Sequence, residues 1–129
     1  MEEQERHHKG LETRREVLGK EHVDRAQANL SEFNAPFQEF ITRYAWGEIW
    51  ERPGLTRRER SLITLAVLVA LNREPEFRIH IRAAINNGVT TEEIREVLIH
   101  AGIYCGLPAA NAAIQAAEQV INETKDRSK

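Results

Sequence analysis

The segment Leu62–Leu71, which reads LITLAVLVAL, is apolar on every side of the helix that it predicts. A helix on the surface of a globular protein keeps one polar face for water, so this helix has to be covered all round. A chain of 129 residues can build a core, but it has difficulty surrounding such a helix alone. The last helix favours close packing as well, because alanines line it at Ala109, Ala110, Ala112, Ala113, Ala116 and Ala117. We therefore expect an all-α subunit that completes its core in an oligomer, rather than a compact monomer around a central helix.

Start and stop signals divide the chain into about six to seven helices. The expected helices cover residues 5–19, 23–29, 36–50, 56–71, 75–87 and 90–105, with a last one from about residue 108. Two segments have the spacing of a capping box, one from Thr56 to Glu59 and one from Thr90 to Glu93. No stretch alternates with the period of a strand, and no linker or repeat divides the chain. The sequence predicts a single domain over residues 1–129, with ragged polar ends at about 1–8 and 125–129.

Composition narrows the class of protein further. Hydrophobic residues make up 41% and charged residues 29%, and a net charge of -2 gives no general attraction to nucleic acid or anionic lipid. The single cysteine, Cys105, cannot form an internal disulfide, and the polar start does not resemble a signal peptide. The apolar run is about half the length of a membrane-spanning helix, which needs roughly 20 residues. We expect a cytoplasmic protein with neither a membrane nor a nucleic-acid partner.

A carboxylate lies in the aromatic stripe of the helix expected over residues 36–50. At about 100° per residue, Glu48 shares this stripe with Phe33, Phe37, Phe40, Ile41 and Tyr44. Removal from water disfavours a charged carboxylate, which suits a general acid or base. The alternative is that Glu48, near the helix end, reaches water or pairs with Arg52. The sequence leaves both open.

The helix expected over residues 75–87 carries a second polar strip. Its apolar stripe contains Phe77, Ile81, Ala84 and Ile85, and Arg78 and Arg82 mark a solvated side. His80 lies on the opposite flank, with Glu76 one turn before it and Asn87 two turns after it. Ala83 and Ala84 border the strip and leave space for a ligand. Because Glu76 is placed to orient the imidazole, we favour a functional histidine over a structural one.

Other candidate groups carry less weight. Tyr104 can offer a phenol to a pocket, although packing is the commoner role, and Cys105 is expected to be a small buried hydrophobe. The remaining histidines show no metal-ligand spacing with one another or with Cys105 (His7, His8, His22 and His100). We therefore expect no metal site.

Several longer strings match a known family. They are RREVLG (14–19), YAWGEIW (44–50), RPGL (52–55), ALNR (70–73), RIHIRAAINNGV (78–89) and YCGLPAANAA (104–113). With these strings, spread over nearly its whole length, the chain resembles the carboxymuconolactone decarboxylases. This family is a branch of the alkylhydroperoxidase-D-like superfamily.

The resemblance implies an all-helical subunit in a hexamer, built as a trimer of dimers. It also implies decarboxylation of 4-carboxymuconolactone to 3-oxoadipate enol-lactone without a cofactor, in the protocatechuate branch of the β-ketoadipate pathway. In the peroxidase relatives, a CxxC pair precedes the histidine on the same helix. Arg73 and Glu76 occupy those two positions here, which argues against thiol peroxidase chemistry.

The residues can be assigned roles in this reaction as a hypothesis. The lactone substrate accepts the electron pair itself, so neither a metal nor an organic cofactor is expected. His80, oriented by Glu76, would donate to the oxyanion or supply the proton, with Glu48 as the alternative proton carrier. Arg43, Arg52 and Arg15 are candidates to anchor the substrate carboxylate. Tyr44, Trp46 and Tyr104 are candidates to line the pocket.

Three alternatives remain open from the sequence. The first is a decarboxylase of a related small lactone acid. The second is an oligomer without catalytic activity that binds an aromatic-derived acid. The third is a degenerate thiol oxidoreductase, which the missing CxxC pair disfavours.

Overall fold

The computed structural model describes residues 1–127 and contains only helices in that part of the chain. The elements are α1 (Glu3–Leu18), α2 (Lys20–Ala28), α3 (Ala35–Ile41), the π-helix η1 (Thr42–Ile49), α4 (Arg57–Ala70), α5 (Glu74–Asn86), α6 (Thr91–Cys105) and α7 (Leu107–Arg127). The all-α prediction is confirmed. The polar start, expected to be ragged over residues 1–8, is helical from Glu3. Of the tail expected to fray, residues 125–127 belong to α7, and the rest lie outside the described residues.

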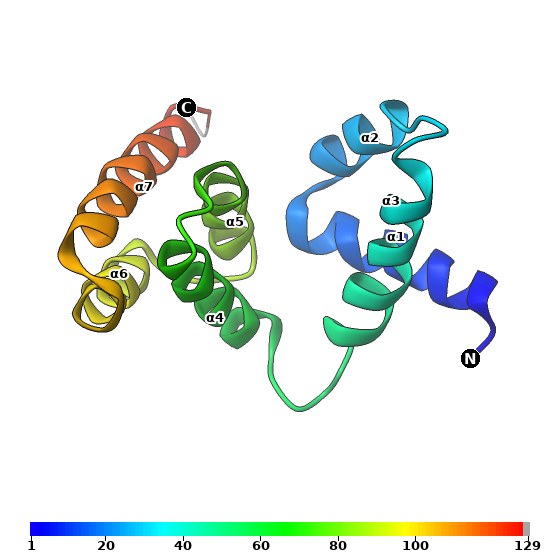
Figure 1. The fold of residues 1–129 in the computed structure, drawn as a ribbon, viewed down its shortest axis with the longest axis horizontal. Coiled ribbons are helices and arrows are strands. Elements are labelled where there is room, and N and C mark those ends of the chain that lie inside the picture. The colour runs from blue at the N-terminus through cyan, green and yellow to red at the C-terminus, as the bar shows by residue number, and fades with distance from the viewer. Residues whose placement is uncertain (128–129) are drawn as a thin grey trace. The chain divides into compact units, whose positions relative to one another are not determined.

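The chain divides into two compact units, Met1–Arg57 and Arg58–Lys129 (Figure 1). The first unit holds α1, α2, α3 and η1, and the second holds α4 to α7. Each unit is described here by itself. The single domain over residues 1–129 stays a prediction.

In the first unit, α1 packs along η1 with almost no space between the two backbones. A Cβ atom on Gly10 would overlap the carbonyl group of Thr42, and one on Gly47 would lie 2.6 Å from the carbonyl oxygen of Arg6. Both positions therefore need glycine. Gly19, with a φ of 98°, lets the chain turn from α1 into α2.

A buried guanidinium lies where α3 gives way to η1. Arg14 is only 6% exposed and donates hydrogen bonds to Gln38 Oε1 at 3.2 Å and Thr42 Oγ1 at 3.5 Å. The Thr42 hydroxyl in turn donates to the Gln38 carbonyl at 2.7 Å. Burial lowers the pKa of Arg14. The wider winding of η1 is visible in the Trp50 amide, which bonds the carbonyl of Ala45, five residues earlier, at 2.9 Å.

In the second unit, α5 and α6 both pack against α7. The core side chains come from all four helices and the α5–α6 connection (Leu65, Val69, Phe77, Ile81, Ala84, Val89, Ile94, Leu98, Ala101, Ala113, Ala116, Ala117 and Val120). The capping box predicted for Thr90 and Glu93 is confirmed, because each side chain bonds the other residue's backbone amide. Arg58 of α4 also forms an ion pair with Glu93, which joins the starts of α4 and α6.

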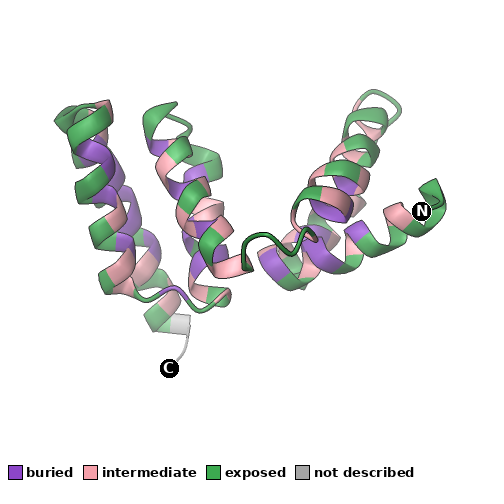
Figure 2. Cartoon of the chain, turned by 90° about the horizontal axis from the view of Figure 1, so that it is seen from below, coloured by how far each residue is buried: buried purple, intermediate pink, exposed green. Residues whose placement is uncertain are grey.

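The apolar helix α4 is covered on one side only by its own unit. Leu65 and Val69 are buried, while Ile63, Val67 and Leu71 are 51%, 47% and 63% exposed. Figure 2 shows the same division, with purple buried residues concentrated on the inner faces of the helices. Within the described residues, no helix combines the length and the hydropathy that a membrane crossing requires.

Candidate active site

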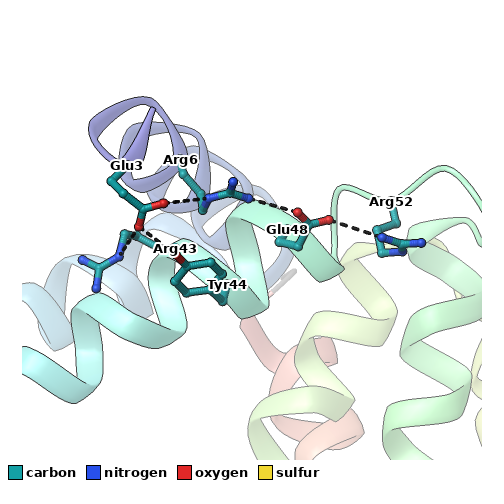
Figure 3. Close-up of polar contacts among 6 residues, drawn as sticks. All are labelled: Glu3, Arg6, Arg43, Tyr44, Glu48 and Arg52. Atoms are coloured by element: carbon teal, nitrogen blue, oxygen red, sulfur yellow. Dashed lines mark hydrogen bonds and ion pairs between the residues drawn. The ribbon is translucent and has the colours of Figure 1, made fainter. Parts of the chain in front are cut away.

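A series of polar and charged side chains links the first turn of α1 to η1 and to the segment just after it (Figure 3). Its members come from the beginning and the end of the sequence of the first unit: Glu3, Arg6, Arg43, Tyr44, Glu48 and Arg52. We call this set the α1–η1 network. It contains four of the residues that the sequence singled out, and two that it did not, Glu3 and Arg6.

Glu3 is the centre of one half of the network. Tyr44 donates its phenol proton to Glu3 Oε2 at 2.8 Å, and Arg43 Nε lies 3.3 Å from the same oxygen. The Arg6 guanidinium lies over the Tyr44 ring, 5.2 Å from its centroid, and that of Arg43 lies at 6.0 Å. The hydrogen bond from Tyr44, followed by the bond from Arg6 and the charges of Arg6 and Arg43, lowers the pKa of Glu3 against the opposing effect of burial. The same bond raises the pKa of Tyr44.

Glu48 is the centre of the other half. Arg6 Nη1 donates to Glu48 Oε1 at 3.0 Å, and Arg52 Nη1 donates to Glu48 Oε2 at 3.4 Å. The side chain of Glu48 is 41% exposed. Burial opposes the charge on Arg6, but hydrogen bonds to Glu48 and Glu3 raise its pKa.

Of the two environments left open for Glu48, the pairing with Arg52 is confirmed. The aromatic residues of the stripe do not enclose the carboxylate, because Phe33, Phe37 and Phe40 are themselves 96%, 63% and 55% exposed. A helical wheel of regular α-helix misplaced Glu48, since η1 winds more widely from Thr42 onward. Its role as a proton carrier stays a prediction.

A hollow of about 310 Å³ lies beside Arg43. Its lining residues are Glu3, Gln4, His7, Glu39 and Arg43. This hollow is lined by two carboxylates and only one guanidinium. Its electrostatics therefore do not favour an anionic ligand.

The first unit places the other two candidates away from the network. Arg15 Nε pairs with Asp24 Oδ1 at 3.2 Å, which ties α1 to α2. Trp46 is 6% exposed and stacks on Trp50 with ring centroids 5.1 Å apart. Packing, the commoner role for Trp46, is therefore what the structure shows.

The second unit holds the polar strip of α5. Phe77 and Ile81 are buried as predicted, Glu76 is exposed, and His80 is half-buried with its Nδ1 atom shielded from solvent. Asn87, at the end of the strip, donates to the buried Ser61 hydroxyl of α4 at 2.9 Å. The orientation of His80 by Glu76 stays a prediction.

One detail of this helix differs from the expectation. Ala83 and Ala84 are 1% and 0% exposed, so packing fills the space that they were expected to leave for a ligand. The side marked by Arg78 and Arg82 is solvated as expected, with Arg82 exposed and Arg78 half-buried. Both arginines also reach α7, where they donate to Gln119 at 2.8 Å and Glu123 at 3.3 Å.

Residues at the end of α6 are also in the second unit. Tyr104 is 82% exposed and its ring lies 5.3 Å from that of His100. Cys105 is half-buried and packs against the core cluster, so it is less buried than expected. Among residues 1–127, no three histidine, cysteine, aspartate or glutamate side chains are grouped so that they could hold a metal ion.

Glu3 and Arg6 could not be recognised from local patterns. Both belong to a polar first helix in which charged residues are frequent, and their partners Tyr44 and Glu48 follow 41 and 42 residues later. Only the docking of α1 on η1 brings them together. The glycines at Gly10 and Gly47 were the one sequence signal of that close docking.

Comparison with known proteins agrees with this architecture. The model of the carboxymuconolactone decarboxylase family matches residues 35–119, which span parts of both units. A 4-carboxymuconolactone decarboxylase of Acinetobacter baylyi is 54% identical over 123 residues, covering 95% of this chain and 92% of the relative. A nitrosuccinic acid decarboxylase of Metarhizium robertsii is 45% identical over 118 residues, covering 92% of this chain and 82% of that protein.

The similarity to these two decarboxylases, over more than nine tenths of an all-helical chain, defines a small enzyme that releases carbon dioxide from an acid. The chain belongs to the carboxymuconolactone decarboxylase family. It is a decarboxylase of that family, and its sequence contains a single cysteine, Cys105.

Proposed function

We propose that this protein converts 4-carboxymuconolactone into 3-oxoadipate enol-lactone and CO2. The observation that carries the proposal is the 54% identity to the Acinetobacter decarboxylase across 95% of the chain. We expect the enzyme to act in the breakdown of aromatic compounds. A cytoplasmic location, expected from the sequence, stays a prediction.

For this reaction the protein has to hold the substrate in position and supply one proton. The leaving carboxylate is on a ring carbon that is conjugated, through a C=C bond, to the lactone carbonyl. When the C–C bond breaks, its electron pair moves into the ring and gives a dienolate with charge on the carbonyl oxygen. A proton then adds to the carbon beside that carbonyl. Donors that meet the developing oxyanion stabilise the transition state.

We assign the proton donation to His80, with Glu48 as the alternative carrier. His80 lies half-buried above an apolar core, where a donor acts in a less aqueous environment than on the open surface. Both oxygens of Glu48 accept from guanidiniums, and to carry a proton it would have to give up one of these bonds. This difference favours His80 as the proton source.

Among the three candidate arginines, we choose Arg52 as the anchor for the substrate carboxylate. Its side chain is 62% exposed and lies one turn from Glu48. Arg15 pairs with Asp24, and Arg43 lines a hollow that also carries two carboxylates. Tyr44 and Tyr104 remain candidates to line the site.

A second substrate class is nitrosuccinic acid, favoured by the 45% identity to the Metarhizium decarboxylase. In that acid, a nitro group next to the leaving carboxylate can accept the electron pair. A site that anchors a carboxylate and protonates a carbanion suits both acids. The substrate therefore has to be decided by measurement.

The deciding assay measures CO2 release and product formation with each acid in turn, after chelation and dialysis of the protein. We expect turnover of 4-carboxymuconolactone with a kcat/KM well above that for nitrosuccinate, at a rate that chelation does not change. Faster turnover of nitrosuccinate would replace the first substrate by the second. A protein that binds 4-carboxymuconolactone but releases no CO2 would support the non-catalytic alternative.

We further propose that the protein is a homo-oligomer, most simply a hexamer. The exposed side of α4, with Ile63, Val67 and Leu71, supports this, because water is a poor neighbour for such a stripe. Light scattering after size exclusion should give the mass of a stable multimer. A well-folded monomer at micromolar concentration would contradict the proposal.

A further inference from the structure

Arg6 makes three separate contacts within the α1–η1 network. Its guanidinium donates to Glu48 Oε1 at 3.0 Å and to Glu3 Oε1 at 3.4 Å, and it lies over the Tyr44 ring. The side chain is 17% exposed. Its own backbone is held too, because the Arg6 carbonyl touches η1 at Gly47, the residue before Glu48.

Arg52, the other partner of Glu48, is much more exposed than Arg6. Its side chain is 62% exposed, and its contact with Glu48 is the longer of the two at 3.4 Å. An exposed ion pair of this type contributes little and exchanges easily with water or another anion. Thus one oxygen of Glu48 accepts a hydrogen bond from the largely buried Arg6. The other oxygen accepts from Arg52, in an exposed ion pair that can exchange.

We propose that Arg6 is a positioning residue that fixes the Glu48 carboxylate, so that Arg52 can leave it and bind the carboxylate of the substrate. The inference rests on the proposed function, in which Glu48 and Arg52 belong to the site. It assigns to the first turn of α1 a part in the decarboxylation, although Arg6 does not touch the substrate. When Arg52 turns to the substrate, Arg6 remains as the counter-charge that keeps Glu48 in place.

The guanidinium group itself is required by this geometry. The planar guanidinium donates to Glu3 through Nε and to Glu48 through Nη1 at the same time. A lysine keeps the charge but offers a single nitrogen, so Arg6→Lys can serve one carboxylate at a time. Arg6→Met keeps most of the length and removes both bonds.

Lys9 provides a matched control. It lies on α1 one turn after Arg6 and also reaches across to the segment after η1, where its Nζ pairs with Glu51 Oε1 at 3.1 Å. Lys9→Met therefore removes a cation and an ion pair from the same helix without touching Glu48. A general effect of charge or of helix docking would appear in both variants, and an effect of positioning only in Arg6→Met.

The experiment compares kcat, KM and melting temperature for the wild type, Arg6→Met, Arg6→Lys, Lys9→Met and Glu48→Gln. We expect Arg6→Met to lower kcat by about 10²-fold, the size of effect that a misplacement of about 1 Å within an active site can have. KM should change much less, because Arg52 still binds the substrate. Arg6→Lys should recover part of the loss, added guanidinium ion should raise the rate of Arg6→Met, and Lys9→Met should stay within about twofold of the wild type.

A crystal structure of folded Arg6→Met gives a readout that does not depend on activity. We expect the Glu48 carboxylate to leave its position or to adopt several conformers. An unmoved Glu48, wild-type kcat in Arg6→Met, or wild-type kcat in Glu48→Gln would each overturn the inference while leaving the decarboxylase assignment intact. Absence of turnover with either acid in the wild type would instead sink the proposed function, and the Glu48 conformer would still decide whether Arg6 holds it.

Discussion

The α1–η1 network and the α5 strip are two polar sites built in opposite ways. The network joins side chains that are 41 and 42 residues apart, and it exists only because two helices dock with their backbones in contact. The strip lies on a single helix, where the period of the α-helix sets the spacing of Glu76, His80 and Asn87 above the core residues Phe77 and Ile81. The first site depends on tertiary docking and the second on local helical geometry.

We therefore expect substitutions in the two sites to have different effects. A substitution that separates α1 from η1 should disturb at once every contact of the network that joins the two helices. A substitution within the α5 strip should leave its neighbours in place, because the core beneath the helix holds the backbone. Stability and activity are therefore expected to be coupled in the first site and separable in the second.

The largest expected effect separates activity from stability on α5. His80→Ala should lower kcat by roughly 10²–10⁴-fold, the usual range for a lost acid–base group, while the oligomer mass by light scattering is unchanged. The control is Arg82→Ala on the same helix, which loses only the contact with Glu123 and should stay within about twofold of the wild-type kcat. If His80→Ala turns over normally and only melts earlier, His80 is a packing residue and the chemistry belongs to the α1–η1 network.

The next effect tests the docking of α1. Gly10→Ala places a methyl group on the Thr42 carbonyl, and such overpacking should lower the free energy of unfolding by about 1–3 kcal/mol. Urea denaturation measures this loss, and kcat should fall with it. Gly54→Ala serves as the control, since a Cβ there meets nothing within 4 Å. A Gly10→Ala protein of unchanged stability would show that α1 and η1 are not in such close contact.

A smaller effect should appear in acid. The pKa of Glu3 is lowered from its ordinary 4.5 by the Tyr44 phenol, Arg6 and Arg43, so its contribution to stability is present above that value. The contribution is lost as the pH falls through the lowered pKa of the folded protein. Wild type should therefore be more stable than Glu3→Gln at about pH 7, and this difference should shrink as the pH falls below 4.5. A difference in stability that does not change with pH would mean that the Glu3 charge is not involved.

The smallest effect concerns the lone thiol. Cys105→Ala should keep kcat within about twofold of the wild type, because decarboxylation of this lactone needs no nucleophile and Cys105 is outside both polar sites. Steady-state assays under reducing and non-reducing conditions test this. A hundredfold loss in the folded variant would assign the thiol a chemical role.

Sequence reasoning succeeded where local rules control the structure. The helix order, the capping box of Thr90 and Glu93, and the apolar face of α5 all follow from signals within one turn or two. It failed where tertiary contacts decide. Ala83 suggested free space for a ligand, but packing fills that space.

The same limit explains what was missed in the candidate site. The pairing of Glu48 with Arg52 was foreseen because the two residues lie one turn apart, and it is confirmed. Arg6 and Glu3 carried no signal of their own, since their partners follow some 40 residues later in the chain. The change from α-helix to π-helix at Thr42 was not visible in the sequence either.

The π-helix η1 has a consequence for sequence alignment across the family. A bond from each amide to the carbonyl five residues earlier takes up one residue more than an α-helical bond, as in the Trp50–Ala45 pair. A relative with one residue fewer between Thr42 and Trp50 can therefore form a regular α-helix here without disturbing the helices on either side. Its acid at the aligned position of Glu48 would then point in another direction. Matching glutamates in an alignment are equivalent to Glu48 only when the length of this segment is also the same.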